Sequence, residues 1–229
     1  MPLNFRHIMT SYKKAVEWWL SGGINPANCV AAYQAKGAAN YEASKINLAN
    51  PGTYNLAEIG GGSVNWANST GWGGFVSLTR CLNTGVTPAL NLTWSMFVRF
   101  SDYSTSNYEV LAGYYNAKKS GFLFGPHYDN DMVSFHGNDD YTQIANNPPR
   151  IAYGVYGFAG RIPYRNGSAE ANTFGTYAGN SPLTIYIGAR CLASGVGNYF
   201  SGNIQAVVVY NTTLTANQVA ALSTAMAGI

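Results

Sequence analysis

Apolar and polar residues alternate along much of the chain, which is the pattern of strands that bury one face. The alternation is clearest between residues 93 and 101, where Trp94, Met96, Val98 and Phe100 form the apolar set. Residues 203–210 are apolar on both faces, which predicts a central strand covered on both sides. Turn-forming residues separate further expected strands at about 75–82, 108–115, 121–128, 132–137, 149–158, 161–165 and 183–188. This regular spacing predicts an all-β sandwich.

One long helix is predicted near the N-terminus. Between residues 9 and 20 apolar side chains recur every three or four positions, and Gly22 and Gly23 can end the helix. Trp18 lies off the apolar stripe, so we expect it to face solvent, where large aromatic side chains are unusual outside interfaces. Two interpretations stay open. The helix packs on the sandwich as a lid, or it docks on another subunit through Tyr12, Trp18 and Trp19.

The C-terminal part of the chain has a distinctive order of elements. A strand ends in Ile187-Gly188, an aromatic-glycine step opens the next strand, and Thr215 with Gln218 forms a capping box for a short helix. The ordered positions are Ile187-Gly188, Phe200, Gly202, Ile204, Tyr210-Asn211, Leu214 and 215–222. This order resembles the C-terminal signature of laminin-G-like, concanavalin A-type sandwich domains.

Three earlier segments support the resemblance more loosely: 72–75, 94–100 and 164–167. Together the similar positions cover roughly residues 28–227. The resemblance implies a concanavalin A-like jelly roll of two antiparallel sheets, with an N-terminal amphipathic helix and a short C-terminal helix. We therefore expect a helical arm at 1–24 and a sandwich domain at 25–229. The fold says little about activity, because it carries lectins, glucanases, adhesion modules and virus coat parts.

The composition excludes some functions. Charged residues make up 10% of the 229 residues and the net charge is +3, so the basic face that nucleic acids require is not expected. The apolar runs are too short for a membrane helix. The first 23 residues do not have the apolar core and cleavage site of a signal peptide. We expect a virion-surface or extracellular location, reached without a signal peptide or membrane segment in this sequence.

Catalytic chemistry is not indicated. Glucanases of this fold class carry three carboxylates at alternate positions of one strand, and this sequence has no such triplet. We therefore expect no enzyme activity and no cofactor. The resemblance suggests a calcium site at the rim of the sandwich, for which Asp129 and Asp131 are candidates. The alternative is that both residues simply form a turn.

Aromatic residues are the main binding signal. Five candidates for a sugar-binding rim are Trp66, Trp72, Tyr115, Tyr128 and Tyr199, because aromatic rings with Asn, Ser and Gly suit adaptable recognition. The alternative for the tryptophans is that they fill the end of the sandwich. Three cysteines argue against a disulfide framework. We expect free thiols, although Cys81 and Cys191 lie in similar tripeptides that can face each other.

Two functions follow from these expectations. The first is a non-catalytic virion-surface protein, for decoration or attachment, that contacts other virion subunits or its own copies through the N-terminal arm. The second is a carbohydrate-binding, lectin-like module of a secreted or cell-surface protein. Glycans are the expected ligands, and neither nucleic acid nor membrane is an expected partner.

Overall fold

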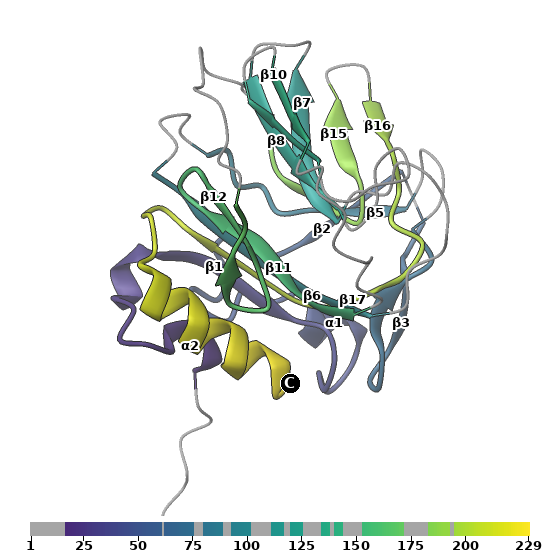
Figure 1. The fold of residues 1–229 in the computed structure, drawn as a ribbon. Coiled ribbons are helices and arrows are strands. Elements are labelled where there is room, and N and C mark those ends of the chain that lie inside the picture. Colours follow the sequence, from purple (N-terminus) through teal and green to yellow (C-terminus); the bar gives the residue numbers. More distant parts are fainter. Residues whose placement is uncertain are drawn as a thin grey trace, which may run out of the picture.

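The computed structural model describes residues 17–60, 62–75, 80–88, 93–101, 111–116, 120–125, 134–137, 140–143, 153–171, 183–192 and 195–229. Two β-sheets face each other across an apolar core, and a helix lies on the outer side of one of them (Figure 1). The predicted all-β jelly-roll sandwich is confirmed, including its short C-terminal helix. No helix in the described ranges has the length and apolar character needed to cross a membrane.

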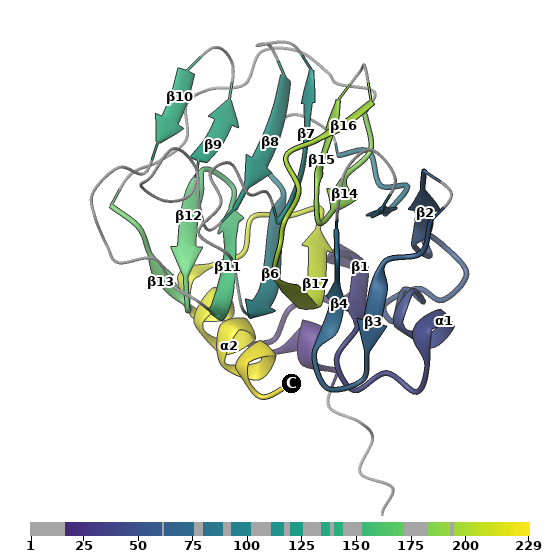
Figure 2. The same ribbon diagram turned by 90° about the vertical axis from the view of Figure 1, so that its right-hand side faces the viewer.

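The larger sheet provides the platform for the candidate site (Figure 2). All of its neighbouring strands are antiparallel. Their order is β13 (Ser168–Ala169), β12 (Ile162–Arg165), β11 (Tyr153–Ala159), β6 (Ser95–Ser101), β17 (Asn203–Tyr210), β4 (Gly71–Gly73) and β3 (Asn65–Ala67), with β1 (Cys29–Gln34) also paired to β17.

The second sheet covers the inner face of the first. Its order is β16 (Gly195–Gly197), β15 (Arg190–Leu192), β7 (Ala112–Asn116), β14 (Tyr186–Ile187), β5 (Cys81–Asn83) and β2 (Ala57–Ile59), with β8 (Ser120–Phe124) paired to β7. The β15–β7 pair is parallel, and the others are antiparallel. Strands β9 (Ser134–Gly137) and β10 (Asp140–Gln143) form a separate antiparallel ribbon.

Alternation along the central strands divides the apolar residues between two layers, as the sequence predicted. From β6, Met96, Val98 and Phe100 enter the core between the sheets, while Phe97 enters a second cluster on the outer face. Strand β17 contributes to both clusters in the same way, with Val207 inside and its neighbours outside. Because β17 is covered on both faces, it anchors the inner core and the outer layer together.

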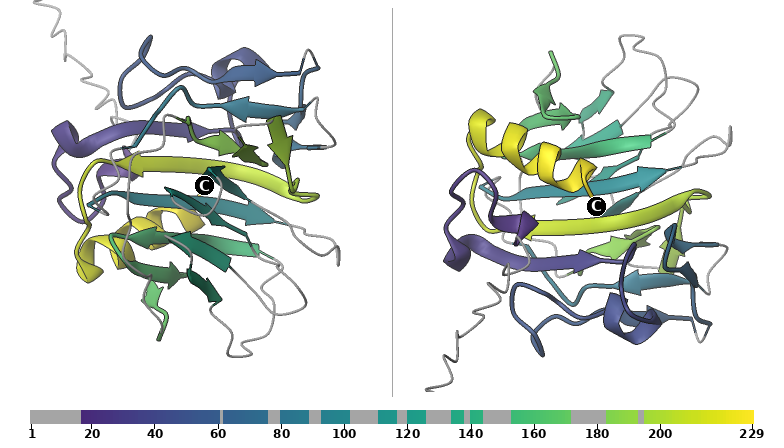
Figure 3. Two further views of the ribbon diagram at one scale, coloured as in Figure 1. Left: turned by 90° about the horizontal axis from the view of Figure 1, so that it is seen from above. Right: turned by 90° about the horizontal axis from the view of Figure 1, so that it is seen from below.

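Helix α2 (Ala216–Ala227) covers the outer face of the larger sheet (Figure 3). It begins with the predicted capping box. The Thr215 hydroxyl accepts from the backbone nitrogen of Gln218, and the side-chain oxygen of Gln218 accepts from the backbone nitrogen of Thr215. Val219, Leu222 and Met226 are fully buried against the sheet. A capping box satisfies helix-end donors that otherwise have no partner, so the sequence fixes where α2 starts.

The predicted α-helix at residues 9–20 is not present at residues 18–20. Residues 1–16, including Tyr12, lie outside the described residues. The part that is described is a 3-10 turn, η1 (Trp18–Leu20), followed by a second one, η2 (Pro26–Asn28). Trp18 is 6% exposed, so it does not face solvent as predicted. Its indole nitrogen donates to Gln34 Oε1 at 2.9 Å, and η1 contacts α2.

Burial also changes the argument for docking at the arm. Trp18 fills the outer-layer cluster of its own chain together with Ile24, and half-buried Trp19 packs edge-on against it at 5.6 Å. The remaining short helix, α1 (Tyr41–Ser44), follows β1. Separate arm and sandwich units, at 1–24 and 25–229, stay a prediction.

Candidate functional site

A cleft opens on the outer face of the larger sheet, beside the end of α2. Its volume is about 350 Å³. Outward-facing residues of β6, β11 and β17 form its floor, and the β12–β13 turn and the last turn of α2 form its walls. The lining residues are Arg99, Phe100, Ser101, Tyr153, Gly154, Val155, Asn166, Gln205 and Ala227. Helix α2 ends at Ala227, which is one of these lining residues.

Tyr153 is the most exposed large aromatic residue among those described, at 74%. It starts β11 opposite Ser101 of β6. Tyr153 lines the cleft, and its high exposure leaves the side chain accessible to a ligand there. Ligand sites commonly combine an apolar surface with a few placed polar groups, and Tyr153 supplies that surface here.

Two hydrogen bonds between Asn166 and the Val155 backbone hold the turn between β12 and β13 beside the cleft. Asn166 adopts a positive φ of 50°, and its Oδ1 accepts from the Val155 nitrogen at 2.9 Å. Its own nitrogen donates to the Val155 carbonyl at 2.8 Å. Gly154, at a φ of 151°, allows this contact because a Cβ there would lie 2.5 Å from Asn166 Oδ1. The wall beside Tyr153 is thus held in a defined position.

Arg99 brings the only charge among the lining residues. Its side chain is half-buried, and its Nη1 donates to the carbonyl of Met226 in the last turn of α2. A cation at a helix C-terminus is favourable because the carbonyl ends of the helix are partly negative. Burial lowers the pKa of the guanidinium below its ordinary value, yet it stays charged at neutral pH.

Gln205 provides an amide on the opposite strand. It lies at a register shift of β17 between Ile204 and Ala206, where the pairing with β6 is interrupted. Its backbone carbonyl accepts from the nitrogens of residues 35 and 36, and its Nε2 donates to Ser101 Oγ at 3.2 Å. Bulges re-aim side chains, and this one leaves a nearly buried amide in the floor of the cleft.

The two tryptophans predicted as rim residues belong to the sandwich itself. They pair across β3 and β4, with Trp66 opposite Trp72. Trp72 is fully buried and its indole donates to Ser44 Oγ at 2.8 Å, so its assignment to a sugar-binding surface is wrong. Trp66 is half-buried and donates to the Ala35 carbonyl at 2.9 Å. Both indole nitrogens need partners once they are buried, and the alternative interpretation, filling the sandwich end, fits them.

The other predicted site residues are distributed over the second sheet and its loops. Tyr199 is half-buried and packs against the core, and burial raises the pKa of its hydroxyl. Tyr115 lies in β7, opposite Gly121 and Leu192. The remaining three candidates, Tyr128, Asp129 and Asp131, lie outside the described residues. A calcium site there stays a prediction.

The described residues hold no group of three or more His, Cys, Asp or Glu side chains arranged to bind a metal. All three cysteines are buried free thiols. Burial raises the pKa of Cys29 and of Cys81 to about 12 in each case, which disfavours the reactive thiolate. Cys81 and Cys191 are both free thiols, and the nearby Cys191 adds to burial in raising the pKa of Cys81.

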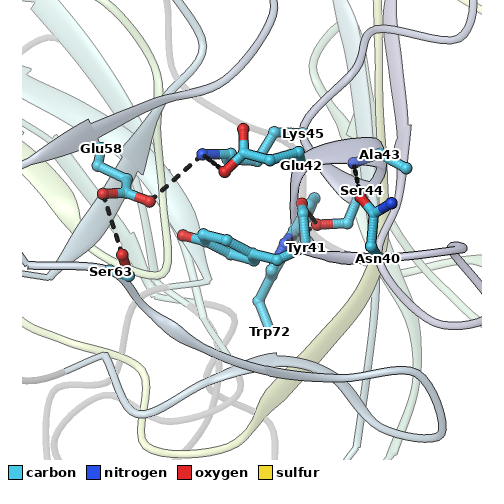
Figure 4. A network of polar contacts seen from close by, with 9 residues as sticks. All are labelled: Asn40, Tyr41, Glu42, Ala43, Ser44, Lys45, Glu58, Ser63 and Trp72. Atoms are coloured by element: carbon cyan, nitrogen blue, oxygen red, sulfur yellow. Dashed lines mark hydrogen bonds and ion pairs between the residues drawn. The ribbon is translucent and has the colours of Figure 1, made fainter.

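A polar network between α1 and β2 of the second sheet was not predicted from the sequence (Figure 4). Lys45 contacts Glu42 at 2.9 Å and Glu58 at 3.3 Å, and Ser63 donates to Glu58 at 3.2 Å. The buried Tyr41 hydroxyl points at Glu58 without the geometry of a full hydrogen bond, and it lowers the pKa of that carboxyl together with Lys45. The contact between Lys45 and Glu58 links the end of α1 to β2.

Comparison with known proteins identifies the fold. No protein-family profile matches the sequence, and no curated protein matches it. Domain 4 of AbnA, a GH43 extracellular arabinanase from Geobacillus stearothermophilus solved with arabinotriose, aligns over 86% of this chain and 98% of that domain, with a TM-score of 0.63 and 14% identity.

Two further solved structures contain the same fold within longer chains. Trypanosoma rangeli sialidase with sialic acid aligns over 88% of this chain and 33% of the sialidase, with a TM-score of 0.58 and 14% identity. A mutant of HCR/D, a toxin receptor-binding domain, aligns over 88% of this chain and 53% of its own, with a TM-score of 0.55 and 12% identity.

These likenesses define the class of protein as a β-sandwich domain of the jelly-roll type. The chain spans nearly all of the arabinanase domain but only about a third of the sialidase. At such low identity the comparisons establish the fold alone. The predicted jelly-roll sandwich is confirmed at that level, and membership of the concanavalin A-like, laminin-G-like family stays a prediction.

Proposed function

We propose that this chain is a non-catalytic carbohydrate-binding module that holds an oligosaccharide in the outer-face cleft. The observation that carries the proposal is the exposed ring of Tyr153 beside the amides of Asn166 and Gln205. Pyranose and furanose rings present C–H groups that pack on aromatic faces and hydroxyls that bond to amides. A cavity of about 350 Å³ lies at the lower end of the range typical of ligand sites.

The structural neighbours support binding of sugars over other roles. The domain that this chain covers almost completely was solved in complex with arabinotriose. That domain and the sialidase both belong to proteins that act on carbohydrates by their printed descriptions. We therefore propose a sugar ligand for this chain too, while the position of its site is argued from its own residues.

A binding role fits the cleft better than hydrolysis. Most glycoside hydrolases need two carboxyl groups flanking the scissile bond. None of the lining residues of the cleft is acidic. A sugar held there has an aromatic platform, amides and a guanidinium beside it, which bind and orient but transfer no proton at neutral pH.

Calorimetric titration with arabinotriose, preceded by a glycan array to find tighter ligands, tests the proposal. Replacing Tyr153 with Ala is expected to weaken binding about tenfold, equivalent to about 1.4 kcal/mol, because the stacking surface is lost. Tyr153→Phe keeps the ring and is expected to bind nearly as the parent does. The control is Tyr54→Ala, a residue 44% exposed outside the cleft, which is expected to change nothing.

Two outcomes of these binding measurements would contradict the proposal. If neither the array nor arabinotriose shows binding, the chain is not a carbohydrate-binding module. If a sugar binds and Tyr54→Ala and Tyr153→Ala weaken it equally, the sugar does not bind in the cleft. Circular dichroism of each variant separates loss of binding from loss of fold.

The virion-surface role, which the sequence analysis placed first, becomes the second proposal. A solvent-facing Trp18 was one argument for docking through the N-terminal arm, and Trp18 is buried against its own chain. None of the three solved structures described above is named as a virion component. Light scattering of the chain before and after removal of residues 1–16 tests this role, which requires stable self-association that depends on that segment.

A further inference from the structure

The side chains that line the cleft carry a net positive charge. Arg99 is the single charged side chain in its lining, and every other lining residue is neutral. On the neighbouring strand β12, by contrast, Arg165 is neutralised by Glu170 at 2.9 Å. Among the described residues Arg99 has no such carboxylate partner, and it is the one charged side chain in the lining of the cleft.

The environment of Arg99 makes this charge costly to leave unpaired. The side chain is half-buried, and burial is the cause that lowers its pKa. Nη1 donates to the Met226 carbonyl, which fixes the position of the guanidinium at the end of α2. A guanidinium carries five N–H donors in a planar fork, so donors remain for an oxygen ligand. A carboxylate is the group that best matches this fork.

Strand register places the charge next to the aromatic platform. Arg99 pairs with Val155 and Ser101 pairs with Tyr153, so Arg99 and Tyr153 are diagonal neighbours on adjacent strands of one face. Diagonal neighbours lie roughly 7–8 Å apart at their Cα atoms. That separation suits a single sugar ring that stacks on Tyr153 while a carboxylate on the ring reaches Arg99.

We infer that the cleft selects acidic oligosaccharides, those whose sugars carry a carboxylate, with Arg99 as the residue that determines this specificity. The inference rests on the proposed function and narrows its ligand to uronic-acid-type or sialic-acid-type sugars. Neutral sugars contact the same ring and amides but offer the half-buried guanidinium no negatively charged partner. A hydrogen bond to a charged group contributes enough to predict at least about tenfold tighter binding of the acidic form.

The test compares trigalacturonate with its fully methyl-esterified form by calorimetric titration of the unmodified chain. The two probes share the same sugar backbone, and the ester replaces each carboxylate with a neutral, slightly larger methyl ester. We expect the acid to bind at least about tenfold more tightly than the ester, and the difference to shrink in high salt because the contact is partly exposed. Equal binding of acid and ester overturns the inference but leaves a carbohydrate-binding module in place. Absence of binding by the acid, the ester and arabinotriose overturns both.

Variants then locate the selectivity. Arg99→Gln is expected to weaken binding of the acid much more than binding of the ester and so to abolish the preference. Arg99→Lys keeps the charge but loses the planar fork, and is expected to keep part of the preference. Because Arg99 also holds the end of α2, circular dichroism and a thermal melt must show that each variant is folded. If Arg99→Gln retains the full preference, another cation recognises the acid and the inference fails. Triglutamate that binds as tightly as trigalacturonate would show that the site takes acidic peptides instead.

Discussion

Replacement of Trp18 with Ala distinguishes a core anchor from a docking residue. The indole is 6% exposed, belongs to the outer-layer cluster and donates to Gln34 Oε1. Truncating a buried Trp to Ala costs about 3–5 kcal/mol, and the edge position of Trp18 places it near 3 kcal/mol. With a urea m-value of roughly 2–3 kcal/mol/M for a chain of this size, the unfolding midpoint should fall by about 1 M.

Two variants complete the experiment, which is read by tryptophan fluorescence and circular dichroism in urea. Trp19→Ala removes the half-buried neighbour and is expected to cost clearly less, about 1 kcal/mol. Trp18→Phe keeps most of the packing and loses the hydrogen bond, also about 1 kcal/mol. If Trp18→Ala unfolds at the same urea concentration as the parent while a self-associated form disappears, Trp18 acts in docking and the packing argument is refuted.

Three further predictions concern the scaffold. Gly157→Ala should prevent folding, because its Cβ would lie 2.0 Å from the Met96 carbonyl oxygen, whereas Gly52→Ala meets no atom within 4 Å and should cost about 1 kcal/mol in urea unfolding. The Tyr41 hydroxyl and then Lys45 lower the pKa of Glu58 in the folded chain. The ionised carboxylate therefore stabilises the fold at neutral pH, and this contribution is lost as the pH falls below about 4. Urea unfolding should show that Glu58→Gln destabilises the fold at pH 7 but not at pH 3. Thiol titration should label the three buried cysteines far more slowly in the native chain than in denaturant, and rapid native labelling would contradict their burial.

Local patterns predicted the central part of the fold well. Alternation along residues 93–101 and 203–210 determined which side chains of β6 and β17 enter the inner core, because pleated strands turn successive side chains to opposite faces. The capping box at Thr215 and Gln218 placed the start of α2. These features depend on neighbours within a few residues, and a sequence displays such neighbours directly.

Features that depend on distant partners were not predicted. Trp18 looked exposed because the helical stripe was continued through a segment that forms a 3-10 turn, and its partner Gln34 lies on another element. Trp72 looked available for sugars, but Ser44 and the core enclose it. The cleft requires the pairing of β6 with β11 and β17, so Tyr153 was one tyrosine among many in the sequence. The high exposure of Tyr153, at the start of β11, depends on how the strands pair and is not encoded in its sequence neighbours.

The central claim is that sugars bind on the outer face of the larger sheet, beside the end of α2. Amide chemical-shift mapping with trigalacturonate tests this claim most directly. We predict that the largest shift changes fall on Ser101, Gly154, Asn166 and Gln205, and that Tyr153→Ala needs about tenfold more trigalacturonate to reach them. Changes confined to strands of the second sheet, with the cleft residues unmoved at saturation, would contradict the account.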